Sequence, residues 1–192
     1  MAKVEKRLVT TPKVEAKWIY LDKPNTRFSE DGGYEITLLF DPDNKEHKKF
    51  LDELEVIEQE LRNELTKTLP AAKRKTISHE PFVKEDIDAE GNETGYLKIK
   101  AKSKYPPAVF DAKLNQITPP SNLGNGTIVR ANIGLKPVLV GRKMFISCYL
   151  QAVQLIEVQT FQGGTDPAAL GFTPEEGFVV EETLDLNDDA DF

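Results

Sequence analysis

Two segments among the first 40 residues alternate apolar and polar residues with the period of a β-strand. The segment VEAKWIYL (14–21) is predicted to form one strand, with Trp18 and Tyr20 on the same face. The segment GGYEITLLF (32–40) is predicted to form a second strand, because apolar side chains occupy every second position from Tyr34 onward. Two strands therefore open the fold.

A change of period after the second strand predicts one long helix, from about Pro42 to Leu69. Asp41 is the expected N-cap, Pro42 suits the first helical position, and Pro70 ends the helix. Apolar residues recur every three or four positions and form one stripe, made of Phe50, Leu54, Ile57, Leu61 and Leu65. The helix is thus expected to pack one face on a core.

The rest of the chain returns to strand patterns after a polar stretch. Residues 71–95 are polar and are expected to be a mobile loop. Four strands are then predicted, over residues 95–105, 108–112, 127–140 and 143–161. Because one helix is inserted among strands, without a regular strand–helix alternation, the pattern favours a small β-barrel over a doubly wound parallel sheet.

The strand at residues 95–105 carries a row of like charges on one face. Lysine occupies every second position, at Lys98, Lys100, Lys102 and Lys104. Such a row repels itself unless something negative lies over it. A solvated sheet face that discourages edge pairing would show the same pattern, so the row alone does not decide the function.

Charge is divided unequally along the chain. The net charge is −7, but residues 144–192 hold ten of the 32 acids and no lysine or arginine, so the first 143 residues carry 25 bases against 22 acids. Residues 1–164 are therefore predicted to form a mildly basic domain, and residues 165–192 a disordered acidic tail. The chain ends in NDDADF, whose Asp188, Asp189, Asp191 and Phe192 suit a basic pocket with an apolar floor.

Catalytic and metal-binding patterns are missing from the sequence. His47 and His79 are far apart and are expected to be solvated, and the single Cys148 is expected to be a buried small apolar residue. The chain contains no phosphate-binding glycine loop, no nucleophile elbow and no apolar run of membrane-spanning length. We therefore expect a protein that is not an enzyme, with no cofactor, no metal and no membrane partner.

Nucleic-acid binding has more support, because bases and aromatics are interleaved along the body. Single strands are held by basic grooves that follow the phosphates and by aromatic side chains on which the nucleobases stack. Each aromatic alone is as compatible with the core as with a surface. The candidate DNA-binding residues are Trp18, Tyr20, Lys98, Lys100, Lys102, Lys104, Tyr105, Arg130, Lys136 and Tyr149.

Taken in order, six segments resemble the replication-type single-stranded DNA-binding proteins of tailed bacteriophages. They are WIYLDKP (18–24), GGYEITLLF (32–40), GYLKIKAKSKY (95–105), VRANIGLKPV (129–138), LQAVQLIEVQTFQGG (150–164) and NDDADF (187–192). The resemblance implies a mainly β, five-stranded OB-fold barrel with an inserted helix. It also implies coating of single strands during phage replication, recombination and repair, in the cytoplasm of the infected bacterial host.

The same resemblance implies a role for the tail. In this family the acidic tail covers the DNA groove when it is empty and recruits the replicative DNA polymerase and the helicase–primase. Some members form homodimers, and the sequence leaves the oligomeric state open. Two other interpretations also stay open: a non-enzymatic adaptor that docks through its acidic-aromatic tail, and an RNA-binding OB domain.

Overall fold

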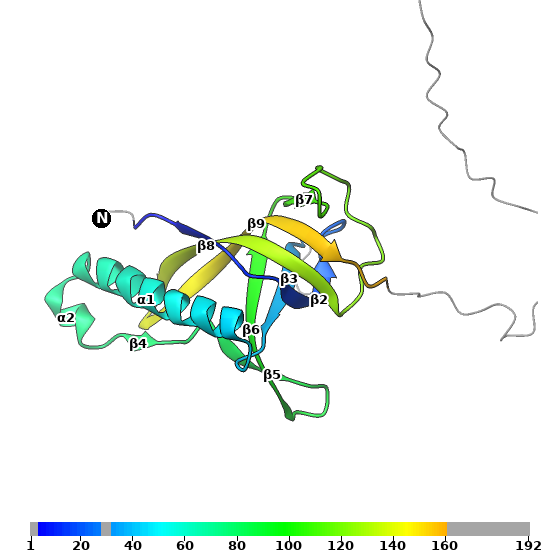
Figure 1. The fold of residues 1–192 in the computed structure, drawn as a ribbon. Helices are drawn as coiled ribbons and strands as arrows, with labels where there is room; N and C mark the ends of the chain where they lie inside the picture. Colours follow the sequence, from blue (N-terminus) through cyan, green and yellow to red (C-terminus); the bar gives the residue numbers. More distant parts are fainter. Residues whose placement is uncertain (1–3, 28–31, 161–192) are drawn as a thin grey trace, which may run out of the picture. The chain divides into compact units, whose positions relative to one another are not determined.

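A computed structural model describes residues 4–27 and 32–160 of the chain (Figure 1). The strands are β1 (Arg7–Thr10), β2 (Val14–Tyr20), β3 (Tyr34–Phe40), β4 (Ser78–His79), β5 (Lys84–Ile87), β6 (Glu93–Ser103), β7 (Ala108–Phe110), β8 (Thr127–Val140) and β9 (Lys143–Glu157). The helices are α1 (Lys45–Lys67) and α2 (Ala71–Arg74). The predicted tail, residues 165–192, and its terminal Asp188, Asp189, Asp191 and Phe192 lie outside the described residues.

Five of the strands close into a barrel, which confirms the predicted OB fold. β2 pairs with β3, β3 with β6, and β8 with both β2 and β9, all antiparallel. A parallel contact between β6 and β9, with Lys102 opposite Tyr149, completes the circle. β1 extends the sheet beside β8 and was not among the predicted strands.

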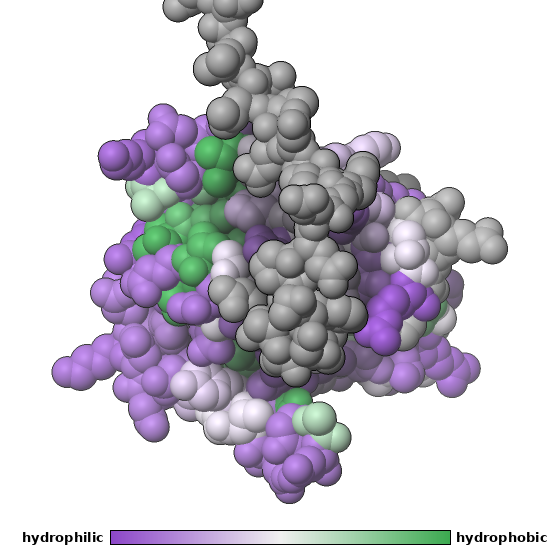
Figure 2. All heavy atoms as spheres, turned by 90° about the vertical axis from the view of Figure 1, so that its right-hand side faces the viewer, coloured by the Kyte–Doolittle hydropathy of each residue, from purple (hydrophilic) through white to green (hydrophobic). Residues whose placement is uncertain are grey.

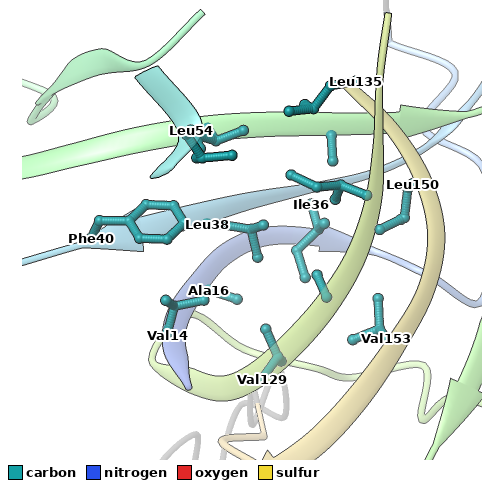
Figure 3. Close-up of a cluster of buried hydrophobic side chains, with 14 of the residues drawn as sticks. Val14, Ala16, Ile36, Leu38, Phe40, Leu54, Val129, Leu135, Leu150 and Val153 are labelled. Carbon is teal, nitrogen blue, oxygen red and sulfur yellow. The ribbon is translucent and has the colours of Figure 1, made fainter. Parts of the chain in front are cut away.

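The barrel interior is filled by alternating apolar side chains from all five strands (Figure 3). Ile36, Leu38 and Phe40 of β3 are fully buried, as the period-two pattern predicts. Helix α1 adds Phe50, Leu54 and Leu61 to this core. Phe50 stacks on Phe40 with ring centroids 5.7 Å apart, so the helix is fixed against the end of β3.

The helix begins three residues later than the sequence predicts. Asn44, not Asp41, is the N-cap, and its side chain accepts hydrogen bonds from the backbone of Glu46 and His47. The backbone N–H of Asp41 instead donates to Nδ1 of His47, at 3.0 Å. The His47 Nε2 lies 2.8 Å from the carbonyl oxygen of Lys13. The prediction that His47 is solvated was therefore wrong, since both ring nitrogens join the helix start to neighbouring loops.

The predicted loop over residues 71–95 is a second correction, because this stretch forms α2, β4, β5 and the start of β6. β5 pairs with β6 as a hairpin, and β4 pairs with β9. Arg62 of α1 holds the segment in place: it pairs with Glu58 and donates to the carbonyl oxygens of Glu80 and Met144. Because these partners come from distant parts of the chain, the local polarity of residues 71–95 does not reveal them.

Candidate nucleic-acid interface

The lysine row lies on the outside of the barrel along β6. Ile99 and Ala101 are fully buried, so Lys98, Lys100 and Lys102 point away from the core, as the alternation predicts. Their side chains become steadily more exposed, at 29%, 43% and 64%. Lys104 is exposed but follows the end of β6 at Ser103, so it extends the row beyond the strand.

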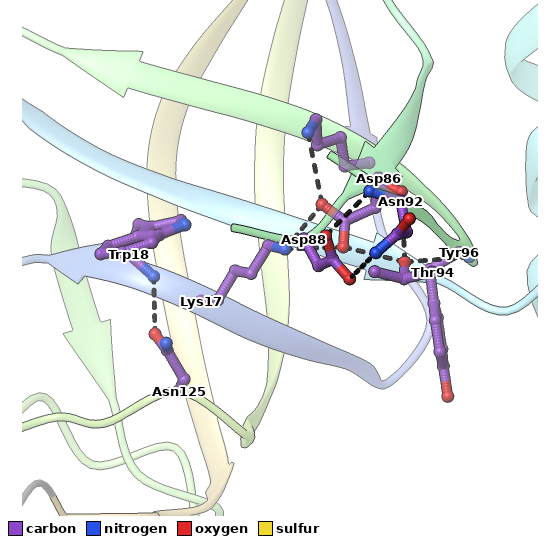
Figure 4. A network of polar contacts seen from close by, with 9 residues as sticks. Lys17, Trp18, Asp86, Asp88, Asn92, Thr94, Tyr96 and Asn125 are labelled. Carbon is purple, nitrogen blue, oxygen red and sulfur yellow. Dashed lines mark hydrogen bonds and ion pairs between the residues drawn. The ribbon is translucent and has the colours of Figure 1, made fainter. Parts of the chain in front are cut away.

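Two nearly buried carboxylates lie among these lysines. Asp86 of β5 is 2% exposed, and its carboxylate lies 2.6 Å from the Lys17 ammonium and 3.3 Å from that of Lys98 (Figure 4). Burial alone would raise the pKa of Asp86, but hydrogen bonds from Lys17, Thr94 and Lys98 hold it below its ordinary value. Asp86 therefore stays ionised and joins β2, β5 and β6.

Glu35 of β3 has the same role further along the row. Its carboxylate lies 2.9 Å from the Lys100 ammonium and 3.5 Å from that of Lys102, and it accepts a hydrogen bond from Asn25. Burial again acts to raise the pKa of Glu35, and the contacts with Lys100 and Asn25 lower it further than burial raises it. The sequence predicted a negative partner from outside the barrel for these lysines, whereas part of that charge is supplied from within the sheet.

A β-bulge turns Trp18 to the outside of the barrel. Strict alternation would place Trp18 in the core with Val14 and Ala16, but the pairing of β2 with β3 is irregular between Lys17 and Tyr20. Trp18 has a φ of +53° and its side chain is 53% exposed. Lys17, Trp18 and Tyr20 consequently share the outer face, and the predicted common face of Trp18 and Tyr20 is confirmed.

Clefts on this face bring several predicted residues together. One cleft, of about 460 Å³, is lined by Lys17, Trp18, Lys98 and Lys100 together with apolar side chains such as Phe82. A smaller cleft, of about 240 Å³, is lined by Trp18, Tyr20, Asn25, Arg27, Glu35 and Lys100. The first half of the lysine row thus lies beside the exposed Trp18 and the partly buried Tyr20.

The second half of the row meets a different pair of aromatic residues. Lys102, Lys104, Tyr105 and Tyr149 line a cleft of about 690 Å³. Tyr105 is 78% exposed, and Tyr149 lies opposite Lys102 in the β6–β9 pairing. Each half of the row therefore has its own aromatic cluster.

The N-terminal arm adds a residue that the sequence reasoning missed. The ammonium of Lys6 lies 5.9 Å from the centre of the Tyr149 ring, a cation–π arrangement. Its stem crosses Gly134, where a Cβ would come within 2.3 Å of it. Lys136 joins Lys6 and Tyr149 around an adjoining cleft of about 620 Å³. In the sequence Lys6 is one of several bases near the start, and nothing distinguishes it.

Among the candidate DNA-binding residues, all of which lie in the described part of the chain, Arg130 is the one that lines none of these clefts. It is exposed on β8, opposite Gln154 of β9, and none of the clefts above includes it. Besides Lys6, the predicted set also lacked Lys17, Asp86 and Glu35, which the structure places among the lysines of the row. Lys17 adjoins Trp18, but the sequence contains no signal that β2 bulges there.

The remaining predictions concern chemistry rather than the groove. Cys148 is partly buried against the core, where burial raises the pKa of its thiol to about 12.

Within residues 4–27 and 32–160, no three His, Cys, Asp or Glu side chains are placed to hold a metal ion. α1 and α2, the helices of that same part of the chain, are too polar or too short to span a membrane. Among the residues coloured in Figure 2, most are hydrophilic, and the largest apolar area lies on the left side.

Comparison with known proteins gives one family and several similar structures. The family model of the single-stranded-DNA-binding protein of Enterobacter phage Enc34 matches residues 7–184. Curated proteins give no significant match. The crystal structure of gp2.5, a single-stranded DNA-binding protein of bacteriophage T7, superposes with a TM-score of 0.61 at 18% identity, covering 92% of this chain and all of that one.

Two structures of the phage Enc34 single-stranded DNA-binding protein are also similar. Its C-terminal truncation has a TM-score of 0.57 at 23% identity and covers 80% of this chain and 88% of that one. Its complex with single-stranded DNA has a TM-score of 0.57 at 21% identity and covers 81% of this chain and 89% of that one. At these identities the structural likeness establishes the fold.

Proposed function

The chain belongs to the family of the phage Enc34 single-stranded DNA-binding protein, and from this premise we propose that it binds single-stranded DNA without sequence preference. The observation that carries the proposal is the lysine row of β6 with an aromatic cluster beside each half. Bases stack on the aromatics, and the lysines follow the phosphates. The chain acts by binding and carries out no reaction.

The place of the row in the barrel supports the proposal. OB folds commonly bind oligonucleotides on the face of their second and third strands, which here are β3 and β6. Lys98 and Lys102 are four residues apart, so the part of the row that lies in β6 spans about 13 Å along the strand. The phage Enc34 protein with the same fold has been solved in complex with single-stranded DNA.

The two carboxylates set how much positive charge faces the DNA. Lys17 and the four lysines of the row face two ionised acids, Asp86 and Glu35, so the net charge of this group is about three. Lysine has three rotatable donors on a flexible stem. Each ammonium can therefore keep its carboxylate contact while it turns another N–H toward a phosphate.

The proposed setting is phage DNA replication, recombination and repair in the cytoplasm of the infected bacterium. Residues 165–192 compete with DNA for the lysine face and recruit the phage polymerase and helicase–primase. The charge division of the chain supports this part, because the acids of residues 144–192 match in sign the phosphates that the row attracts.

The test is a fluorescence-anisotropy titration of labelled oligo-dT, an RNA oligomer of matching length and a DNA duplex, with the full chain. We expect single-stranded DNA to bind most tightly. With about three phosphates neutralised, affinity should fall roughly twentyfold between 50 and 200 mM salt. Preference for the RNA oligomer would favour the RNA-binding alternative, and absence of binding to all three would favour the adaptor.

A charge-removal variant locates the surface. Replacing Lys102 and Lys104 by glutamine spares the lysines that contact Asp86, so the fold is expected to survive. The salt slope should become shallower by about 1.4. The matched control replaces Lys45 and Lys48 of α1 by glutamine, which removes the same charge from a helix that lines none of the clefts described above. Equal effects of the two double variants would contradict the proposed surface.

A further inference from the structure

The backbone at Trp18 is in a conformation that large side chains rarely adopt. A φ of +53° belongs to the left-handed region, which is mostly occupied by glycine and asparagine. Trp18 also has no partner in the register of β2 with β3, because it lies in the irregular stretch between Lys17 and Tyr20. Both features call for support from elsewhere in the fold, because strained residues persist only where their surroundings fix them.

That support comes from the turn before β8. Oδ1 of Asn125 accepts a hydrogen bond from the Trp18 N–H at 3.0 Å (Figure 4). The turn is itself held at both sides: the Gly126 N–H donates to the carbonyl oxygen of Ala16 at 3.0 Å, and the Gly124 N–H donates to that of Gln159 at 2.7 Å. Asn125 is therefore presented to Trp18 from a fixed position, 107 residues away in sequence.

In this position Trp18 lines two clefts, and Tyr20 lines both of them as well. The first is the cleft of about 240 Å³ that also contains Arg27 and Lys100. The second is a cleft of about 940 Å³ between the start of the β2–β3 loop and the turn before β8. Its lining includes one acid, Asp22, together with Lys23, Ser121 and Asn122, whose side chains suit a phosphate and the polar edges of a nucleobase.

We propose that Asn125 is a positioning residue, which holds Trp18 as a partition between two neighbouring nucleotides of bound single-stranded DNA. One nucleotide lies on the lysine side, and the next lies in the cleft bounded by the turn before β8. The DNA path then crosses β2 instead of ending at it. This inference rests on the proposed function and adds a second base site and its supporting residue.

The experiment uses the full chain, whose one tryptophan is Trp18, so its fluorescence reports on this site alone. In Asn125→Ala the N–H of Trp18 loses its acceptor. We expect Trp18 to change its accessibility to acrylamide, to lose most of its quenching by oligo-dT, and affinity for oligo-dT to fall about fivefold, the effect of one weakened base stack. Asn125→Asp keeps an acceptor oxygen and should restore the quenching amplitude.

Asn115→Ala is the matched control, because it shortens an exposed asparagine that lines none of the clefts described above and whose side chain contacts Asp111 and not Trp18. Wild-type acrylamide accessibility, DNA quenching and affinity in Asn125→Ala would overturn the inference, as would equal loss of quenching in Asn115→Ala. If the wild-type chain fails to bind labelled oligo-dT, the proposed function fails. The acrylamide measurement on the free Asn125→Ala chain still decides whether Asn125 positions Trp18. If circular dichroism shows that Asn125→Ala is unfolded, the quenching amplitude of Asn125→Asp decides instead.

Discussion

Replacing Asp86 by asparagine should strengthen DNA binding while it weakens the fold. Asparagine has nearly the same shape but no charge, so Lys17 and Lys98 lose their common counterion. The two ammonium groups then become available to phosphates. Stability and affinity are expected to move in opposite directions, which a simple loss of structure cannot produce.

The size of each effect follows from the contacts. Hydrogen bonds between charged groups contribute about 1.5–3 kcal/mol, so the variant should lose on that order of unfolding free energy. For a domain of this size, each kcal/mol corresponds to about 2–4 °C in Tm. The net charge facing the DNA rises from about three to about four, which steepens the salt slope by about 0.7. Affinity at 50 mM salt should rise by up to about fivefold.

The assay combines thermal unfolding with anisotropy titrations of oligo-dT at four salt concentrations. Asp88→Asn is the control, because Asp88 lies on the same hairpin but accepts its hydrogen bonds from the hairpin's own turn, from Glu90 and Asn92. It should lower stability and leave the salt slope unchanged. An Asp86→Asn chain that is folded but has the wild-type slope would refute the idea that Asp86 withholds lysine charge from DNA.

Three further outcomes are expected. Leu114 has a φ of +69° and is 70% exposed, and Gly91 occupies the matching place in the similar DAEGN loop (88–92). Leu114→Gly should therefore stabilise the chain by about 0.5–1 kcal/mol in urea unfolding. A lower urea midpoint would contradict this. The pKa values of Asp86 and Glu35 are held below their ordinary 3.8 and 4.5, so the two carboxylates stabilise the fold fully at neutral pH. This stabilisation is lost as the pH falls through and below those values. In an acid titration followed by circular dichroism, the stability of Asp86→Asn should therefore depend less on pH than that of the wild type. Truncation after Thr173 should tighten oligo-dT binding most at low salt, and unchanged affinity would refute competition by the tail.

The elements with a clear period were predicted correctly. In β3, β8 and the lysine strand β6 apolar residues recur at every second position, and the apolar stripe of α1 is regular. Periodicity is a local property that survives in any fold that buries one face. The helix start was less exact, because Asp41 and Asn44 are both good caps. In the structure Asn44 is the cap, and the backbone N–H of Asp41 donates to His47.

The elements that were missed depend on contacts between distant residues. Nothing in the polar sequence of residues 71–95 shows that Arg62 will fix Glu80 and Met144 beside the helix. Likewise, strict alternation would bury Trp18 beside Ala16, and the bulge that exposes it is supported by Asn125. A pattern along one strand can place a residue on a face, but it cannot show a partner more than a hundred residues away.

The sequence and the structure predict different numbers of phosphates neutralised by the lysine face. From sequence, the four lysines of the row should neutralise about four phosphates, a salt slope near −2.8 and a loss of about fiftyfold between 50 and 200 mM salt. In the structure, Lys17 joins the row while Asp86 and Glu35 take up part of its charge, which leaves about three and a slope near −2.1. The salt slope of oligo-dT binding, measured on the wild-type chain, distinguishes these two values. A value near −2.1 means that the carboxylates keep their lysines in the complex, whereas a value near −2.8 or steeper means that DNA displaces them.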